Sequence, residues 1–377
     1  DAPSELQPQT LAVTSWPLAS WHRRCRSSVV RLIMALAPRS RPQRRNSCQP
    51  RSRETGKNTS ARGLMDRLLA SSKAAVTNTL SKGEKVLAVS IGNFGDRFSR
   101  IAKAYGADVV DLKFPEGESA PPDSVRQALE TDASITTVLV THNETSTGIT
   151  NDIEGIAAVV KKEFNKLLLV DAISSLGSIK LLTDDWDLDV VVSASQKGWA
   201  CPPGVAMLSF SDRAWEAYEN SDMPKFYFDL KEADKYLKLG QNPWTPAVSV
   251  FYGMDHALMK MLDKGNMQET WDFHASIAQY TRDQISSIGL DLVATDIDHA
   301  SNTVTAAYLP EGITDESLLG MLRDDYDIIA AEGRGKLAGK VFRIGHMGHV
   351  TTEDIDGVIS ALKDALPKLG FTPQVAG

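Results

Sequence analysis

The sequence predicts an α/β fold with a largely parallel central sheet. Short apolar runs, most of them rich in valine, recur along the chain, and stretches with an amphipathic period of about 3.6 residues lie between them. Continuous apolar runs are typical of strands that helices cover on both faces. The alternation of these runs with helical patterns therefore indicates repeated β-α-β units.

The expected elements follow in order along the chain. The apolar runs predict strands over residues 86–89, 137–140, 167–170 and 190–192. Amphipathic helices are predicted between them, at 124–131 and 153–164. A long helical pattern over residues 256–288 then leads into a unit of mixed short strands and helices, residues 290–377.

Length and charge limit the domain organisation and the class of partner. A chain of 377 residues exceeds what one hydrophobic core usually supports, so we expect a large domain over 74–265 and a smaller α+β domain over 266–377. The net charge of −7 gives no general attraction for nucleic acid or anionic lipid. No apolar run approaches the length of a membrane span, about 20 residues. We therefore expect small-molecule substrates, no nucleic acid and no membrane.

The cysteines bear on the compartment. Cys25, Cys48 and Cys201 are odd in number and far apart, which fits neither a disulfide framework nor a zinc site. A reducing environment is the simplest explanation. We therefore expect a cytoplasmic protein.

Residues 1–73 form an atypical basic segment. Between about residue 20 and residue 67 the chain is rich in Arg, Ser, Pro and Gln and nearly free of acids. Three explanations remain open: a presequence, which would direct the protein to an organelle, a disordered basic arm, or a stretch translated in the wrong reading frame.

Polar residues follow the predicted strands at the points where the strands end. Asp171 comes directly after one strand, and Lys197 lies a few residues after the next. Because ligands bind at the carboxyl ends of parallel strands, we expect both side chains at one edge of the sheet. Alone, Asp171 would be a helix cap and Lys197 a solvated loop lysine. Together they match the Schiff-base lysine and the ring-nitrogen carboxylate of a pyridoxal-phosphate site.

Other catalytic patterns are missing from the sequence. It contains no phosphate loop of the GxxxxGK[ST] type, no GxSxG nucleophile elbow and no HExxH pair. His346 and His349 are three residues apart, but no third ligand with suitable spacing accompanies them. We therefore expect no metal site.

The chain from about residue 74 to residue 367 resembles the class V aminotransferases of fold type I. The most similar members are the alanine-glyoxylate and serine-pyruvate aminotransferases, a group that includes proteins described as a small subunit of a soluble hydrogenase. Four motifs in family order carry the resemblance, at residues 143–148, 170–177, 195–204 and 342–348. The resemblance implies a large domain with a mostly parallel sheet flanked by helices and a smaller C-terminal α+β domain.

The resemblance also implies pyridoxal 5′-phosphate as cofactor, with a set of binding residues. Lys197 would hold the cofactor as an aldimine and shuttle a proton, and Asp171 would pair with the pyridine nitrogen. Gln196 would lie beside the cofactor and Thr145 at its ring oxygen. Phe94 falls where the family often has a tryptophan that stacks on the ring; phenylalanine keeps the stacking face and loses the indole N–H.

The resemblance implies one residue that binds the substrate and one that acts between subunits. Arg343 matches the arginine that binds the substrate carboxylate, for which a planar guanidinium is suited. Thr245 matches a residue that reaches the cofactor phosphate of a neighbouring subunit. The resemblance therefore implies a homodimer.

The implied reaction is transamination of alanine or serine with glyoxylate or pyruvate. Two alternatives stay open, an aspartate aminotransferase of the same class and a non-catalytic subunit of the soluble-hydrogenase type. A cysteine desulfurase is disfavoured, because Gln196 rather than histidine precedes Lys197 and Cys201 follows only four residues later.

The sequence departs from the family before residue 74. The family carries a glycine-rich phosphate loop ahead of a helix, whereas residues 66–73 here contain no glycine that would allow the backbone close to a phosphate. The Gly-Pro-Thr start of the family is also not recognisable. The departure favours the interpretation that residues 1–73 differ from those of the working enzyme.

Overall fold

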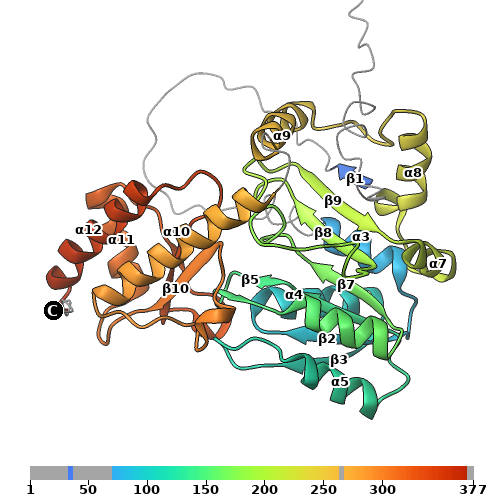
Figure 1. Ribbon diagram of the computed structural model, residues 1–377, viewed down its shortest axis with the longest axis horizontal. Helices are drawn as coiled ribbons and strands as arrows, with labels where there is room; N and C mark the ends of the chain where they lie inside the picture. The colour runs from blue at the N-terminus through green and yellow to red at the C-terminus, as the bar shows by residue number, and fades with distance from the viewer. Residues whose placement is uncertain (1–32, 37–69, 263–266, 372–377) are drawn as a thin grey trace, which may run out of the picture.

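A seven-stranded sheet forms the centre of the computed structural model, which describes residues 33–36, 70–262 and 267–371 (Figure 1). Its strands lie in the order β1-β9-β8-β7-β4-β2-β3. The bounds are β1 (Ile33–Leu36), β2 (Lys85–Ser90), β3 (Asp108–Lys113), β4 (Thr137–Thr141), β7 (Leu167–Asp171), β8 (Val190–Ala194) and β9 (Val205–Phe210). The five strands from β8 to β3 are parallel, whereas β9 and β1 are each antiparallel to their neighbour. The predicted parallel sheet is confirmed, and all four predicted strands lie within it.

Helices cover both faces of this sheet. One face packs on α3 (Ala70–Thr79), α4 (Asn93–Tyr105), α7 (Asp212–Asn220) and α8 (Leu230–Lys238). The other packs on α5 (Pro122–Thr131), α6 (Ile153–Ala157) and η1 (Ala158–Glu163). Within β2, Val86 and Ala88 face the first layer and Leu87 and Val89 the second, as the two-residue period of a strand requires. Burial on both sides explains why the strands are continuous apolar runs.

The helix predicted over residues 153–164 changes type part of the way along. It begins as α6 and continues as the π-helix η1, a wider turn that the apolar period does not predict. Within η1, Lys161 is 3% exposed and pairs with Asp189 at 2.6 Å. That buried ion pair joins residues far apart in the chain, so local periodicity cannot reveal it.

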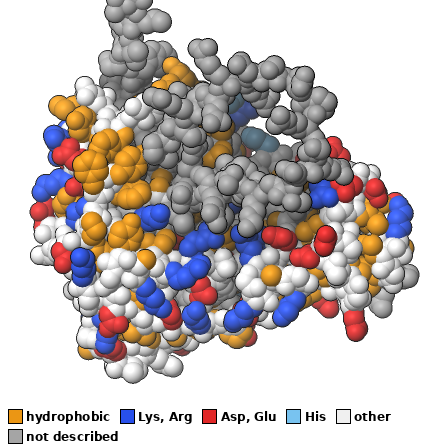
Figure 2. All heavy atoms as spheres, turned by 180° about the vertical axis from the view of Figure 1, so that it is seen from behind, with side chains coloured by type: hydrophobic (Ala, Val, Ile, Leu, Met, Phe, Trp, Pro, Cys, Tyr) orange, Lys and Arg blue, Asp and Glu red, His pale blue; other side chains and the backbone are white. Residues whose placement is uncertain are grey.

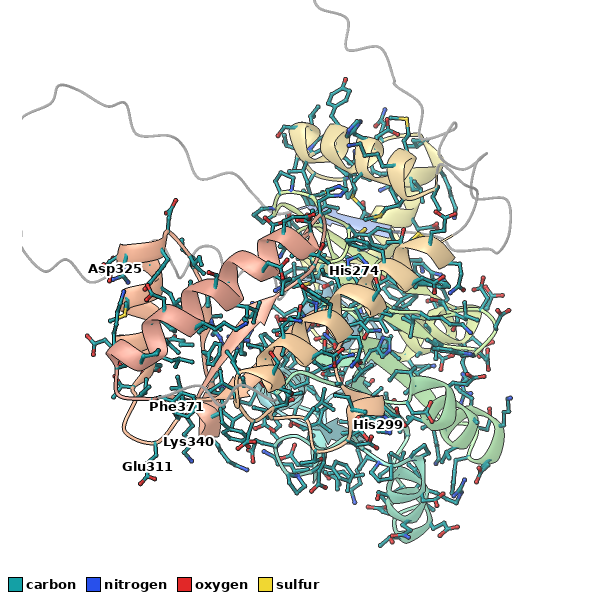
Figure 3. All side chains as sticks on the ribbon, turned by 60° about the vertical axis from the view of Figure 1, so that its left-hand side comes forward. His274, His299, Glu311, Asp325, Lys340 and Phe371 are labelled. Atoms are coloured by element: carbon teal, nitrogen blue, oxygen red, sulfur yellow. The ribbon has the colours of Figure 1, made fainter. Side chains whose placement is uncertain are left out.

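A smaller unit follows the main sheet. Its three-stranded antiparallel sheet has the order β10-β12-β11, with β10 (Val304–Tyr308), β11 (Ala331–Glu332) and β12 (Val341–Gly345). The helices α10 (Gln268–Ser287), α11 (Asp315–Tyr326) and α12 (Thr352–Lys368) pack on it around one apolar core. Figure 3 shows Asp325 and Phe371 on the side of this unit away from the main sheet and His274 nearer to it.

The helical pattern over residues 256–288 corresponds to two helices. The first, α9 (Val248–Met261), begins earlier than predicted, and α10 begins at Gln268. The sequence between them includes Gly265 and Asn266, which favour helices poorly, although residues 263–266 lie outside the described residues.

The structure describes only parts of the basic N-terminal segment. Strand β1 pairs with β9, and residues 70–73 form the first turn of α3. Residues 1–32 and 37–69 lie outside the described residues. The domain limits at residues 74 and 265 therefore stay predictions. Among the described helices, none is both long and apolar enough to cross a membrane.

Candidate active site

The candidate residues meet at the carboxyl edge of the parallel strands. At the end of β4, Thr141 lies opposite Asp171 of β7, and Asp171 lies opposite Val192 of β8. The chain segments that leave these three strands therefore start side by side, which is where open α/β sheets bind ligands. They carry Thr145, Asp171 and Lys197.

Asp171 is a buried carboxylate with few partners. Its side chain is 9% exposed, and Oδ1 accepts a hydrogen bond from the backbone N–H of Ile173 at 3.0 Å. Burial, with a smaller contribution from the charge of Glu144, raises the pKa of Asp171 to about 6, while Arg97 and Lys197 act in the opposite direction. A cationic ring nitrogen would supply the partner that this carboxylate lacks.

Lys197 lies in the turn that follows β8. Its half-buried ammonium has a lowered pKa, first because of burial and then because of the positive charges of Arg343 and Arg334. The turn is fixed by backbone bonds, since the N–H of Ala200 donates to the Lys197 carbonyl at 2.9 Å. A lowered pKa increases the fraction of neutral amine, which is the nucleophilic form.

Asp171 and Lys197 act on each other without touching. Each charge shifts the pKa of the other group, yet no ion pair joins them among the described residues. The Nζ atom of Lys197 has no hydrogen-bond partner in the described part of the chain either. A carboxylate and an amine held apart at one sheet edge fit the two ends of a pyridine ring with an aldehyde, as in pyridoxal phosphate.

Glu144 organises the start of α4. It lies in the small hairpin of β5 (Asn143–Glu144) and β6 (Ile149–Thr150) and is fully buried. Its carboxylate accepts the backbone N–H groups of Phe94 at 2.7 Å and Gly95 at 3.0 Å, and both the N–H and the hydroxyl of Ser146 at 3.1 and 2.5 Å. A carboxylate at a helix N-terminus is electrostatically favourable. Sequence reasoning assigned no role to Glu144.

The half-buried Phe94 is thereby held at the edge of the site. The guanidinium of Arg97, one turn along α4, lies 4.7 Å from the centroid of the Phe94 ring. This cation–π contact occupies one face of the ring, and the charge of Asp171 acts on the same arginine. A cofactor ring could stack on the other face.

Arg343 projects from β12 of the smaller sheet and is oriented by two carbonyl groups. Its Nε donates to the Glu332 carbonyl at 3.0 Å, and its Nη1 donates to the Thr145 carbonyl at 2.6 Å. The side chain is 7% exposed, and burial lowers its pKa. Among the described residues nothing bonds to Nη2, so part of the guanidinium remains available for a carboxylate.

Thr145, Gln196 and Thr245 differ in their surroundings. Thr145 is buried and Gln196 half-buried, and neither side chain makes a hydrogen bond to another described residue. Thr245 is exposed in the segment that leads into α9, beside Trp244, whose ring stacks on Tyr227 at 5.4 Å between centroids. No bond between described residues therefore links Thr245 to the other candidate site residues of the same chain.

The first turn of α3 contains a buried hydroxyl that lacks a partner. Ser71 is 0% exposed, and its Oγ makes no hydrogen bond. The helix packs against β8 and α4. This hydroxyl is a suitable donor to a phosphate. The sequence alone does not single out Ser71, because the phosphate loop expected from the family is rich in glycine and residues 66–73 contain none.

Neither the desulfurase pattern nor a metal site gains support from the geometry. The thiol of Cys201 is 8% exposed and donates to the Trp199 carbonyl at 3.1 Å, and burial raises its pKa, so it is not an activated nucleophile. His346 is buried and bonds to Thr305 at 3.0 Å, whereas His349 is exposed. Within the described ranges, no group of three or more His, Cys, Asp or Glu is arranged to hold a metal ion.

Two arginines of the site also escaped the sequence reasoning. Arg97 and Arg334 act electrostatically on each other, and Arg334 also acts on Lys197 and Arg343. Arg97 could have been found from its position one helical turn after Phe94. Arg334, between Gly333 and Gly335, gave no local signal.

Comparisons with known proteins agree with this geometry. The family model described as aminotransferase class-V matches residues 69–358. The chain is 38% identical over 307 residues to the small subunit of a soluble hydrogenase from Synechococcus, covering 81% of this chain and 79% of that protein. It is 36% identical over 307 residues to the L-aspartate–glyoxylate aminotransferase of Paracoccus denitrificans, covering 80% and 77%.

A solved structure extends the agreement to the fold. The alanine–glyoxylate aminotransferase of Nostoc superposes with a TM-score of 0.75 and 30% identity, over 81% of this chain and 86% of that one. The expected resemblance and the fold type I architecture are both confirmed. The chain belongs to the class V aminotransferases and is an aminotransferase.

Proposed function

We propose that this aminotransferase binds pyridoxal 5′-phosphate and moves an amino group from a small 2-amino acid to a 2-oxo acid such as glyoxylate or pyruvate. The observation that carries the proposal is the position of Asp171, Lys197 and Arg343 around one sheet edge, electrostatically coupled and not paired with one another. Glyoxylate as the acceptor is supported by two similar proteins, an L-aspartate–glyoxylate aminotransferase and an alanine–glyoxylate aminotransferase.

The residues that would hold the cofactor surround this edge. Lys197 would bind it through Nζ, Asp171 would hold the proton of the ring nitrogen, and Phe94 would stack on the ring. Thr145 and Gln196 would contact the ring edge, and the first turn of α3 with Ser71 would hold the phosphate. When bound, pyridoxal phosphate supplies an electron sink for the negative charge that develops at the substrate's α-carbon.

Lys197 would also move the proton of the reaction. Its lowered pKa makes the neutral amine more abundant near pH 7 than for a free lysine, so Nζ can accept the proton from the substrate's α-carbon. The Arg343 guanidinium would bind the substrate carboxylate through the N–H groups that do not donate to Glu332 and Thr145. It would thereby aim the α-carbon at Lys197.

Asp171 is suited to keeping the ring nitrogen protonated. With a pKa of about 6, it is about nine-tenths ionised at pH 7. A cationic nitrogen beside it lowers the pKa further, because opposite charges favour the ionised form. Asp171 would therefore remain an anion throughout the reaction.

We further propose that the enzyme is a homodimer with its active sites at the interface. Thr245 is exposed, and the neighbouring helix α9 exposes Val248, Tyr252 and Met259 at 51%, 64% and 47%. Figure 2 shows hydrophobic side chains gathered at the left, the side of the molecule where Figure 1 has α7 and α8 at the right. A second copy that covers α9 would bury this surface and bring Thr245 to the partner's phosphate. The cytoplasmic location expected from the cysteines stays a prediction.

Replacement of Lys197 tests the proposed reaction. We expect Lys197→Ala to lower transamination by a factor of about 100 to 10,000, the usual contribution of a positioned acid–base group. The exposed Lys180 serves as the matched control, because Lys180→Ala removes the same groups without touching the site. Full turnover by Lys197→Ala would disprove the proposal. A protein without turnover of any donor and without the cofactor's visible absorbance would support the non-catalytic alternative.

A further inference from the structure

Three guanidinium groups act on the charged residues of the site, Arg343 and Arg334 on Lys197 and Arg97 on Asp171, and only Arg343 makes hydrogen bonds to described residues through its guanidinium. Arg343 donates to two carbonyl groups. Arg97 lies over the Phe94 ring and makes no hydrogen bond or ion pair to another described residue. The guanidinium of Arg334 also makes no hydrogen bond or ion pair to any residue that the structure describes. In Figure 2, Lys and Arg side chains gather near the middle of one face of the molecule.

The backbone around Arg334 fixes its position next to the start of α4. A side chain at Gly333 would collide with the carbonyl oxygen of Leu337, so the chain passes close to η4 (Gly335–Leu337). Gly335 has a φ of +60°, and a Cβ there would lie 3.3 Å from Nδ2 of Asn93, the first residue of α4. The loop that carries Arg334 therefore lies against the helix that carries Phe94 and Arg97.

The hydrogen bonds of Arg343 place the same loop beside the substrate position. The Glu332 carbonyl that accepts from Arg343 is two residues before Arg334, in β11. Burial is the largest cause of the lowered pKa of Arg343, Lys197 and Arg97, and the positive charge of Arg334 lowers each of the three pKa values further, for Lys197 after the effect of Arg343. The contact of this loop with Asn93 and the contact of Arg97 with Phe94 therefore place both arginines at the same end of α4, beside the site.

The nearby acids do not neutralise these two arginines. Glu144 already accepts four hydrogen bonds from Phe94, Gly95 and Ser146. Asp171 is the proposed partner of the ring nitrogen. The carboxylate of Glu332 forms no ion pair within the described part of the chain. Unpaired exposed arginines are common, because water solvates them, but two that repel each other at the mouth of a site indicate an anionic ligand.

We propose that Arg97 and Arg334 bind a second carboxylate of the substrate, so that the preferred amino donor is a dicarboxylic acid of the aspartate type rather than alanine or serine. The proposal rests on the proposed function, in which Arg343 binds the carboxylate next to the reacting carbon. Planar guanidiniums bind carboxylates with two parallel hydrogen bonds, which suits Arg334 better than a lysine at the same place. The site would therefore prefer aspartate to alanine and serine, because the latter two leave the guanidiniums of Arg97 and Arg334 unpaired.

Donor kinetics of the purified holoenzyme test the proposal. With glyoxylate as acceptor, we expect kcat/KM for L-aspartate to exceed that for L-alanine and L-serine at least about tenfold. Arg334→Gln should lower kcat/KM for aspartate about 10- to 100-fold more than kcat/KM for alanine or serine, because only aspartate loses a charged hydrogen bond, whereas all three donors are affected by the lost charge near Lys197. Arg334→Lys should restore part of the loss, because it returns the charge without the planar geometry.

Lys336 provides a matched control in the same loop. Lys336→Gln removes one positive charge two residues away, but its Nζ pairs with Glu116 at 2.9 Å rather than facing the site. We expect this variant to keep the wild-type donor preference. Equal loss for all donors in Arg334→Gln, or wild-type preference for alanine or serine over aspartate, would overturn the proposal.

Binding of an unreactive dicarboxylate separates this proposal from the proposed reaction. By calorimetry, maleate should bind the wild-type protein more tightly than the monocarboxylate propionate, and Arg334→Gln should remove the difference. Equal affinities of the two acids for the wild-type protein would overturn the second carboxylate site even if no donor were turned over. Turnover of alanine and serine without a preference for aspartate would overturn the donor inference and leave the proposed transamination intact.

Discussion

The backbone N–H of Phe94 donates to the buried carboxylate of Glu144 at 2.7 Å, so an acid with no assigned chemistry positions the ring at the edge of the site. We expect Glu144→Gln to lower the free energy of unfolding by about 1–3 kcal/mol, because an amide offers one acceptor oxygen where the carboxylate offers two. The exposed Glu118 is the control, since Glu118→Gln should leave stability unchanged. Urea denaturation of both variants measures the difference, and equal midpoints would contradict the positioning role.

Two buried histidines predict acid sensitivity. Burial lowers the pKa of His142 and of His346 to about 3, whereas both titrate near 6.5 in the unfolded chain. Only the unfolded state therefore gains protons as the pH falls below 6.5, and stability is lost progressively down to the folded pKa. At pH 5 each histidine should lower the free energy of unfolding by about 2 kcal/mol relative to its value at pH 7.

Asp171 increases the stability of the folded state over part of this pH range, whereas the two histidines decrease it. Its pKa is raised to about 6, so in the pH range from about 6 to about 4 the folded state binds more protons than the unfolded state. Denaturation at several pH values should still show a net loss of stability below pH 6.5. His346→Asn should flatten the profile, while His256→Gln, at an exposed position, should leave it unchanged. A wild-type profile that is flat between pH 7 and pH 5 would show that the two histidines are not held neutral.

The unpartnered hydroxyl of Ser71 predicts an effect on cofactor affinity. We expect Ser71→Ala to weaken binding of pyridoxal phosphate about tenfold, because one donor to the phosphate is lost. Binding of pyridoxal, which has no phosphate, should not change. Ser276→Ala, in the exposed part of α10, is the control. If Ser71→Ala bound both compounds as the wild type does, the phosphate would have to lie elsewhere.

The exposed face of α9 predicts the oligomeric state. Tyr252→Asp should convert a dimer to a monomer, because a charge would be buried in an apolar contact. Ile329 is 88% exposed and lies in the loop before β11, so Ile329→Asp provides a control with an equally exposed apolar residue. Sedimentation equilibrium measures the mass of each. A wild-type monomer that is fully active would exclude a role of Thr245 across an interface.

The sequence predicts the main sheet well, because strands buried on both faces leave a local signal. The apolar runs lie within β2, β4, β7 and β8, and their order places Asp171 and Lys197 at one edge. The π-helical turn around Lys161 leaves no such signal, because its ion pair with Asp189 depends on packing between distant segments.

The candidate site is predictable only in part, for a similar reason. Lys197, Asp171 and Arg343 stand in motifs, whereas Arg334 belongs to the site because of where its loop packs against Asn93. Ser71 is noticeable only once its hydroxyl is known to be buried without a partner. Electrostatic coupling and lost solvation are properties of the folded arrangement, so residue spacing does not contain them.

The two carbonyl bonds of Arg343 have a consequence for how the site meets its substrate. Its guanidinium joins β12 to Thr145 in the main unit through a bond of 2.6 Å, and a second bond of 3.0 Å holds it to Glu332 in the smaller sheet. The side chain therefore loses its rotamer freedom when the protein folds, not when the substrate arrives. Because the arginine is already fixed, binding of a carboxylate costs no further side-chain conformational entropy. Binding also requires no movement of the smaller unit toward the main unit.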